Sequence, residues 1–189
     1  MHFLRFLKQF LTSIKMANRM KLVEKHGTFL RMLEKYCAAN AAAASASGGG
    51  SITAHARGRI SLDAYAANPR IAILHIENAK KKGSIDASMM LQLATALDTL
   101  EATLAADDTD TAPIGLICIS SGDFFCSGLD LNLAKNCINT SAHGSLMCDF
   151  MSDALARVYK APLVSVSVVG GPALGGGSEL VLATDYRIM

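Results

Sequence analysis

The stretch PLVSVSVVGGPALGGGSELVLATDYRIM, residues 162–189, decides the fold: an apolar, β-rich run enters a glycine cluster and leaves it as a short helix. A glycine turn at a helix start presents backbone N–H groups that have no partner inside the helix. Such donors suit an anion or a developing oxyanion. Glu179 stands just inside the predicted helix and is the only carboxylate between Asp153 and Asp185. The stretch therefore combines an electrophile-stabilising turn with one ionisable group.

A second glycine-bearing turn, DFFCSGLDL at residues 123–131, follows another apolar run at residues 113–120. Donors at the ends of two strands can converge on one carbonyl oxygen above a sheet. By position we predict the N–H of Leu129 and the N–H of Gly176 as that pair. The alternative is that the glycines only permit tight turns and close helix packing. Glu179 likewise has two interpretations, as a catalytic acid or base or as a cap of the helix start.

Other glycine motifs do not fit these turns. A phosphate-binding P-loop needs Gly-Lys-Ser/Thr, but no lysine follows the glycine cluster at residues 175–177. A dinucleotide fingerprint would need glycine where Pro172 or Ala173 stands, and a nucleophile elbow would need GxSxG around Ser178. Asp123 and Asp130 are interpreted as turn formers that accept backbone hydrogen bonds.

Composition predicts one globular domain with an additional segment, because the chain has 189 residues of which 51% are hydrophobic. The net charge of +2 gives no support for nucleic-acid binding. Five cysteines without a CxxC pair favour reduced thiols and an intracellular protein. No stretch reaches the roughly 18 uncharged apolar residues that a membrane span needs, so we expect a soluble protein without membrane association.

Three segments follow one another along the chain. Residues 1–36 form a basic, amphipathic N-terminal arm in which five basic residues precede the first acid, Glu24. Either it is a solvated or mobile extension, or it is a mitochondrial presequence. Residues 37–51, CAANAAAASASGGGS, are interpreted as a flexible Ala/Ser/Gly linker. The folded domain is expected over residues 52–189.

Within that domain, apolar runs predict strands at residues 70–76, at 113–120, from 162 and from 185. Asp86 is the predicted N-cap of a helix that ends near residue 106, and a polar loop containing His143 and Gly144 precedes a helix over 145–159. Strands alternating with helices indicate an α/β fold. Because the chain ends on an apolar strand, we expect a truncated isoform, a fragment or an incomplete gene model.

Taken together, the motifs resemble the crotonase superfamily, the enoyl-CoA hydratase/isomerase group. The resemblance rests on the order and spacing of FCSGLDL at 125–131, the glycine stretch at 162–180 and DYRI at 185–188. It implies a crotonase-like spiral of repeated ββα units, truncated after the N-terminal part of its core, and a coenzyme A thioester as substrate, with no metal or redox cofactor. It also implies a homo-oligomer, trimer or hexamer, for full-length members, and a cytosolic role in fatty-acid metabolism, with the mitochondrion as the alternative.

The resemblance also implies roles for single residues. The oxyanion-hole positions fall on Leu129 and Gly176, a catalytic glutamate falls on Glu179, and the turn beside the coenzyme A moiety falls on Cys126, Ser127, Gly128 and Leu129. The likeness is greatest to members that decarboxylate a 2-carboxyacyl-CoA such as ethylmalonyl-CoA or methylmalonyl-CoA through an enolate. Two alternatives stay open: an enoyl-CoA hydratase/isomerase, which would need a second carboxylate as a hydratase, and an inactive, truncated binding subunit.

Overall fold

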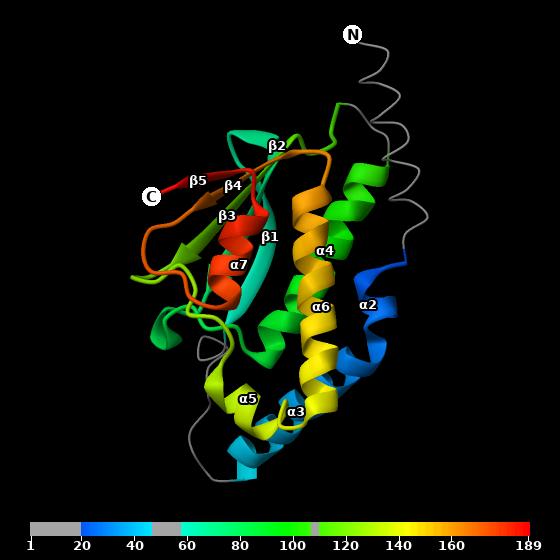
Figure 1. The fold of residues 1–189 in the computed structure, drawn as a ribbon. Coiled ribbons are helices and arrows are strands. Elements are labelled where there is room, and N and C mark those ends of the chain that lie inside the picture. Colours follow the sequence, from blue (N-terminus) through cyan, green and yellow to red (C-terminus); the bar gives the residue numbers. More distant parts are fainter. Residues whose placement is uncertain (1–19, 47–57, 107–109) are drawn as a thin grey trace.

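The computed structural model describes residues 20–46, 58–106 and 110–189. Its centre is a five-stranded sheet in the order β1-β2-β3-β4-β5 (Figure 1). The strands are β1 (Arg59–Tyr65), β2 (Asn68–Glu77), β3 (Gly115–Ser121), β4 (Val164–Val168) and β5 (Tyr186–Ile188). β1 and β2 form an antiparallel hairpin, whereas β2 to β5 pair in parallel. Mixed strands and helices confirm the predicted α/β class.

The strand pattern agrees with the apolar runs and adds one strand. β2, β3, β4 and β5 lie where the sequence predicted them, and Leu74 of β2 pairs with Cys118 of β3 deep in the core. β1 was not predicted. Its sequence RISLDAY alternates polar and apolar residues, the period of a strand with one buried face. Ile60 is buried on that face.

The predicted helix after Asp86 is confirmed as α4 (Ala87–Ala105). The Asp86 side chain caps it by accepting a hydrogen bond from the Met89 N–H at 3.0 Å. The following helix begins earlier than predicted: α6 spans Ser141–Lys160, because Thr140 Oγ1 accepts a hydrogen bond from the His143 N–H at 3.2 Å. His143 and Gly144 therefore lie in the first turn of a helix and not in a loop.

The segment before residue 47 differs most from the sequence-based expectation. Residues 22–46 form α2 (Leu22–Lys25) and α3 (Gly27–Ala46), so a helix, and not a linker, occupies positions 37–46. Alanine has the highest helix propensity, which explains how a low-complexity run forms a helix. Leu22, Phe29 and Leu33 are at most 1% exposed and belong to the main core. A solvated arm is thus wrong for residues 22–33. Residues 1–19 of the predicted arm and residues 47–57 lie outside the described residues.

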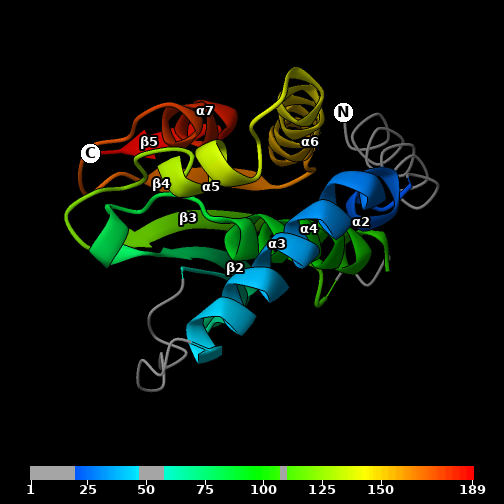
Figure 2. The same cartoon turned by 90° about the horizontal axis from the view of Figure 1, so that it is seen from below.

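Burial and charge together hold α2 and α3 on the domain. In Figure 1 α4 and α6 lie side by side with α2 beside them, and Figure 2 shows α3 crossing next to α4. Asp98 of α4 accepts hydrogen bonds from the N–H groups of Leu22 (2.6 Å) and Val23 (3.0 Å) at the start of α2. Arg157 of α6, 2% exposed, donates to the same Asp98 at 3.2 Å and to the Met20 carbonyl at 2.9 Å.

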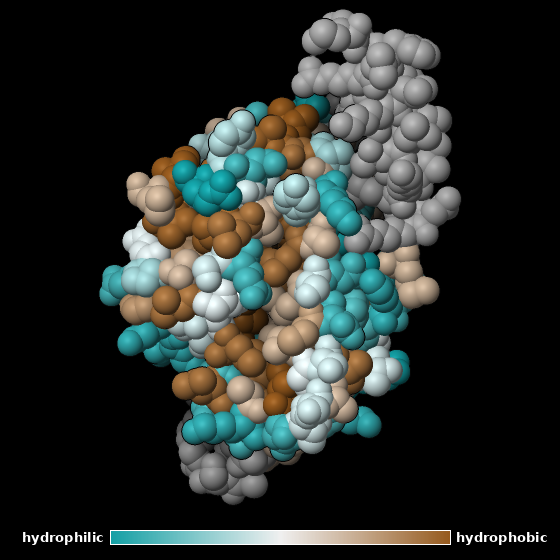
Figure 3. All heavy atoms as spheres, viewed as in Figure 1, coloured by the Kyte–Doolittle hydropathy of each residue, from teal (hydrophilic) through white to brown (hydrophobic). Residues whose placement is uncertain are grey.

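At the other end of the sheet, α7 (Gly176–Ala183) leads into β5. β5 is the edge strand of the described sheet, and Figure 3 shows hydrophobic surface over α7 and β5. Leu182 and Ile188 are 70% and 59% exposed there. Asp185 fixes the corner between α7 and β5, because its carboxylate accepts from both the N–H and the hydroxyl of Ser165 on β4, each at 2.8 Å.

Candidate functional site

The turn that follows β3 is held by a short helix that the sequence did not predict, α5 (Leu131–Asn136). Asp130 is its N-cap: the carboxylate accepts from the N–H groups of Asn132 (2.9 Å) and Leu133 (3.0 Å). The interpretation of Asp130 as a backbone-bonding turn residue is confirmed. Because Leu129 directly precedes this cap, its backbone lies at a fixed junction between turn and helix.

The turns after β3 and β4 lie against each other. Phe125 N–H donates to the Pro172 carbonyl at 3.0 Å, and Leu174 N–H donates to the Cys126 carbonyl at 2.8 Å. A β-bridge joins Cys126 to Ala173, and another joins Leu129 to Ile85, which follows β2. Segments that are far apart in sequence thus meet beside Leu129 and the start of α7.

Glycines allow this close approach. Gly128 has φ +88°, and a β-carbon there would lie 2.9 Å from the Leu174 carbonyl oxygen and 3.4 Å from the Gly176 nitrogen. Gly177 is buried against the Cys126 carbonyl in the same way, so a side chain at this position would overlap that backbone. The interpretation of these glycines as packing residues is correct for Gly128 and Gly177, and it does not compete with a functional one, because the packing places Gly176 beside the Leu129 turn.

The two predicted donors are both unengaged in the described residues. The N–H groups of Leu129 and Gly176 donate to no described atom, although their neighbours do: Asp130 N–H bonds the Ile85 carbonyl at 3.0 Å and Gly177 N–H bonds the Leu174 carbonyl at 2.9 Å. Gly176 is the first residue of α7, where the helix leaves N–H groups free and its dipole favours negative charge. Each of these N–H groups is of the kind that can donate to an anionic oxygen.

Glu179 lies in the first turn of α7 with an exposed side chain. The N-cap, Gly175, provides no side-chain bond, and the Glu179 carboxylate accepts no hydrogen bond from the described residues, so the capping interpretation has no contact to support it. Asp185, the other carboxylate after the glycine turn, is engaged by Ser165. Of the two carboxylates that follow the glycine turn, Glu179 is therefore the one without a hydrogen-bonding partner among the described residues.

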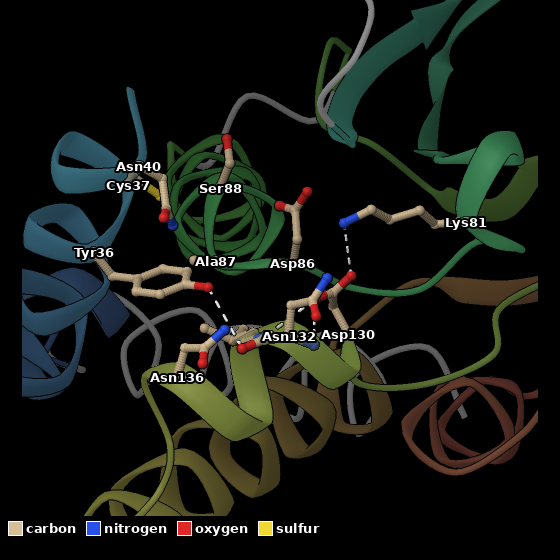
Figure 4. A pocket seen from close by; sticks show the side chains of 11 residues that line it. Tyr36, Cys37, Asn40, Lys81, Asp86, Ala87, Ser88, Asp130, Asn132 and Asn136 are labelled. Carbon is tan, nitrogen blue, oxygen red and sulfur yellow. Dashed lines mark hydrogen bonds and ion pairs between the residues drawn. The ribbon is translucent and has the colours of Figure 1, made fainter. Parts of the chain in front are cut away.

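A cavity of about 370 Å³ lies between α3 and the start of α5 (Figure 4), and Asp130 is the residue of the turn after β3 that lines it. Lys81 reaches into it from the loop after β2 and pairs with Asp130 at 2.8 Å, while Tyr36 of α3 donates to the Asn132 carbonyl at 3.5 Å. Burial raises the pKa of the Asp130 carboxyl, but the hydrogen bonds from Lys81 and the backbone outweigh it and hold that pKa below its ordinary value. The same bond to Asp130 raises the pKa of Lys81, against the effect of burial.

Lys81 and Tyr36 were not among the predicted site residues. The three consecutive lysines at 80–82 were visible in the sequence as part of a loop, but nothing in the pattern distinguished the one that faces Asp130. Tyr36 belongs to a segment interpreted as an arm. Only the packing of α3 brings it to α5.

Three further findings concern the described residues. Burial raises the pKa of the Cys126 thiol, so this cysteine is held as a neutral thiol in the turn. In the described ranges, no three His, Cys, Asp or Glu side chains are grouped as a metal site would need. None of the helices that the structure describes combines the length and the apolar character required to cross a bilayer.

Comparison with known proteins gives one family. Residues 66–189 match the enoyl-CoA hydratase/isomerase family. Curated relatives include ethylmalonyl-CoA decarboxylase of Gallus gallus, 39% identical over 63% of this chain and 37% of the relative, and of Rattus norvegicus, 37% identical over 68% of this chain and 40% of the relative. The chain thus spans about two fifths of the length of these relatives.

Solved structures show the same fold. An enoyl-CoA hydratase from Bacillus anthracis superposes with a TM-score of 0.57 at 23% identity, over 68% of this chain and 46% of the other. An enoyl-CoA hydratase/isomerase (crotonase) from Legionella pneumophila superposes with a TM-score of 0.58 at 19% identity, over 69% of this chain and 47% of the other. The predicted crotonase-like fold is confirmed.

Proposed function

This chain belongs to the enoyl-CoA hydratase/isomerase family, and from that membership we propose that it binds an acyl-CoA thioester and decarboxylates a 2-carboxyacyl-CoA such as ethylmalonyl-CoA or methylmalonyl-CoA. The observation that carries the proposal is the pair of unengaged N–H groups, Leu129 and Gly176, on turns that pack against each other. The relatives named ethylmalonyl-CoA decarboxylase support the choice of substrate class.

The chemistry needs little beyond those two donors. When the bond between the α-carbon and the carboxylate breaks, CO₂ leaves and the electron pair delocalises onto the thioester oxygen as an enolate. Two N–H groups fixed at that oxygen stabilise the charge as it develops, and loss of one such donor typically costs on the order of 100 to 1000-fold in rate. The start of α7 adds its dipole to the same position. A proton then returns to the α-carbon, and Glu179 is the proposed residue for positioning or protonation.

The coenzyme A moiety is proposed to lie along Cys126, Ser127, Gly128 and Leu129. In this turn Cys126 and Gly128 are buried, whereas Ser127 and Leu129 are half-buried and the Leu129 N–H has no acceptor among the described residues. Polar backbone at a turn suits the amides of a pantetheine arm, which need hydrogen-bonding partners when they leave water.

A decarboxylase accounts for this site better than a hydratase does. Adding water across a double bond needs groups that handle both the water and the α-proton. Here Glu179 is exposed and available, whereas Asp185 already accepts two bonds from Ser165. One available carboxylate is enough to return a proton after CO₂ is lost.

The test is direct measurement of CO₂ release from ethylmalonyl-CoA by the full chain, with folding checked by circular dichroism. We expect turnover above the rate of a buffer blank. A folded protein that binds a saturated acyl-CoA but releases no CO₂ would instead indicate the inactive binding subunit, and release of hydration product from crotonyl-CoA would indicate the hydratase.

A further inference from the structure

A second segment holds the turn that contains Leu129. The loop after β2, with the short 3₁₀ helix η2 (Ala79–Lys81), lies along one side of it. Ser127 N–H donates to the Lys82 carbonyl at 3.0 Å, and Ile85 N–H donates to the Gly128 carbonyl at 2.7 Å. These bonds, with that from Asp130 N–H to Ile85, fix the residues on both sides of Leu129. They leave the Leu129 N–H itself free within the described residues.

Lys81 adds an ion pair to these backbone hydrogen bonds. Its Nζ lies 2.8 Å from Asp130 Oδ2, while Asp130 Oδ1 accepts from the first N–H groups of α5. One carboxylate therefore connects the loop after β2 to the start of α5, and Leu129 lies between the two. The Lys81 carbonyl also accepts from the Ser127 hydroxyl at 3.5 Å.

The ion pair between Lys81 and Asp130 differs from a surface ion pair, which typically contributes little to the stability of the fold. The Asp130 side chain is 8% exposed, and its partner Lys81 is 46% exposed. A nearly buried carboxylate that loses its one side-chain counter-charge among the described residues has to recruit water or change conformation, because a buried unpaired charge is costly. Asp86, which caps α4 beside Lys81 (Figure 4), adds a second negative charge to the same cavity.

We propose that Lys81 is a positioning residue for the thioester site: through its ion pair with Asp130 it holds the Leu129 peptide unit so that the N–H faces the thioester oxygen. The inference rests on the proposed function, because the oxygen is that of the acyl-CoA. Donors act on a developing oxyanion only when they are fixed beforehand, and misplacement by about 1 Å can cost on the order of 100-fold. Lys81 touches no reacting atom in this scheme and acts only through Asp130.

The first experiment needs no ligand. Hydrogen exchange of the Ile85 and Asp130 amides is measured by NMR in the wild type, in Lys81→Met and in Lys80→Met. Lys80 is the matched control, because it is an exposed neighbour in η2 without an ion pair in the described residues. We expect exchange about 10-fold faster or more in Lys81→Met, as loss of a charged hydrogen bond implies, and no change in Lys80→Met. Unchanged exchange in Lys81→Met would overturn the proposal.

The second experiment adds butyryl-CoA, a thioester without a carboxylate to lose, and follows the amide shifts of Leu129 and Gly176. In the wild type, the amide chemical shifts of both residues should change when butyryl-CoA is added. In Lys81→Met the Leu129 response should shrink while the Gly176 response stays, and Lys81→Arg, which keeps the charge, should recover it. Asp130→Asn keeps the helix cap and removes the charge, so it should reproduce the loss. A full Leu129 response in both charge-removing variants would refute the positioning role.

The two hypotheses fail differently. If the wild type shows no shift at either amide, the proposed thioester site is wrong, whereas a wild-type response that survives Lys81→Met contradicts only the role of Lys81. With a turnover assay in hand, Lys81→Met should lower kcat by about 10 to 100-fold with little change in KM. A purely structural role would lower the unfolding temperature and leave kcat of the folded protein intact.

Discussion

Gly128 and Gly176 lie so close that a β-carbon on Gly128 would stand 3.4 Å from the amide nitrogen of Gly176. The contact joins the turn after β3 to the start of α7, the two segments that carry the N–H groups of Leu129 and Gly176, which have no acceptor among the described residues. The geometry of the proposed site therefore depends on a residue that contributes no functional group of its own.

Gly128→Ala should disrupt this contact. The positive φ and the approach to the Leu174 carbonyl both oppose a side chain, so we expect a loss of more than about 1 kcal/mol in the free energy of unfolding. Urea denaturation measures it. The control is Gly144→Ala in α6, where no atom lies within 4 Å of the added carbon and stability should not fall.

Gly176→Pro should remove one donor and keep the fold. Proline is tolerated at the first position of a helix, and an added β-carbon meets nothing within 4 Å at Gly176. We expect CO₂ release from ethylmalonyl-CoA to fall by on the order of 100 to 1000-fold. Gly176→Ala retains the N–H and should keep most of the activity; equal activity of both variants would exclude this amide from the site.

Glu179→Gln tests the proposed proton transfer. The side chain is exposed and makes no hydrogen bond to the described residues, so the unfolding free energy should change by less than about 1 kcal/mol through the loss of its interaction with the helix dipole. Turnover should fall by about 100-fold or more if Glu179 returns the proton. The rate of CO₂ release from ethylmalonyl-CoA gives the measurement, and unchanged kcat would leave Glu179 without a catalytic role.

Asp153 should make the stability depend on pH. Burial raises the pKa of its carboxyl, but hydrogen bonds from Lys25 and His26 and the charge of Arg157 lower it from 3.8 to about 2. A depressed folded-state pKa gives stabilisation that is complete above about pH 4 and is lost as the pH falls toward 2. The difference in unfolding free energy between wild type and Asp153→Asn should be about 1–2 kcal/mol at pH 6 and vanish near pH 2. Asp149→Asn, on the exposed side of the same helix, should change little at either pH.

Phe29→Ala tests whether α3 is part of the domain. Phe29 is 1% exposed, and its ring lies 5.5 Å from that of Phe150 on α6. Truncation should cost about 3–5 kcal/mol. Tyr159→Ala, at a position 69% exposed, should stay within about 0.5 kcal/mol of the wild type. A small effect at Phe29 would mean that α3 does not pack on the core in solution.

Local patterns were sufficient for much of the fold. Apolar runs predicted four strands, and Asp86 as an N-cap predicted α4, because these signals are visible without tertiary information. α5 was missed, since six residues carry too little periodicity, although Asp130 marked its start. The prediction of a linker over residues 37–46 was wrong. Ala-rich sequence is compatible with both a mobile chain and a helix, and the packing of α3 decides between them.

By itself, the sequence determined the fold family and the two turns, because the glycines and the residues around them stand at fixed spacings along the chain. Only the tertiary structure decided which groups meet. It paired Lys81 with Asp130 across 49 residues and Asp98 with the start of α2 across 76. It also showed that the N–H groups of Leu129 and Gly176 are free in the described residues. Such contacts depend on how helices and strand ends are placed relative to one another, which no local pattern encodes.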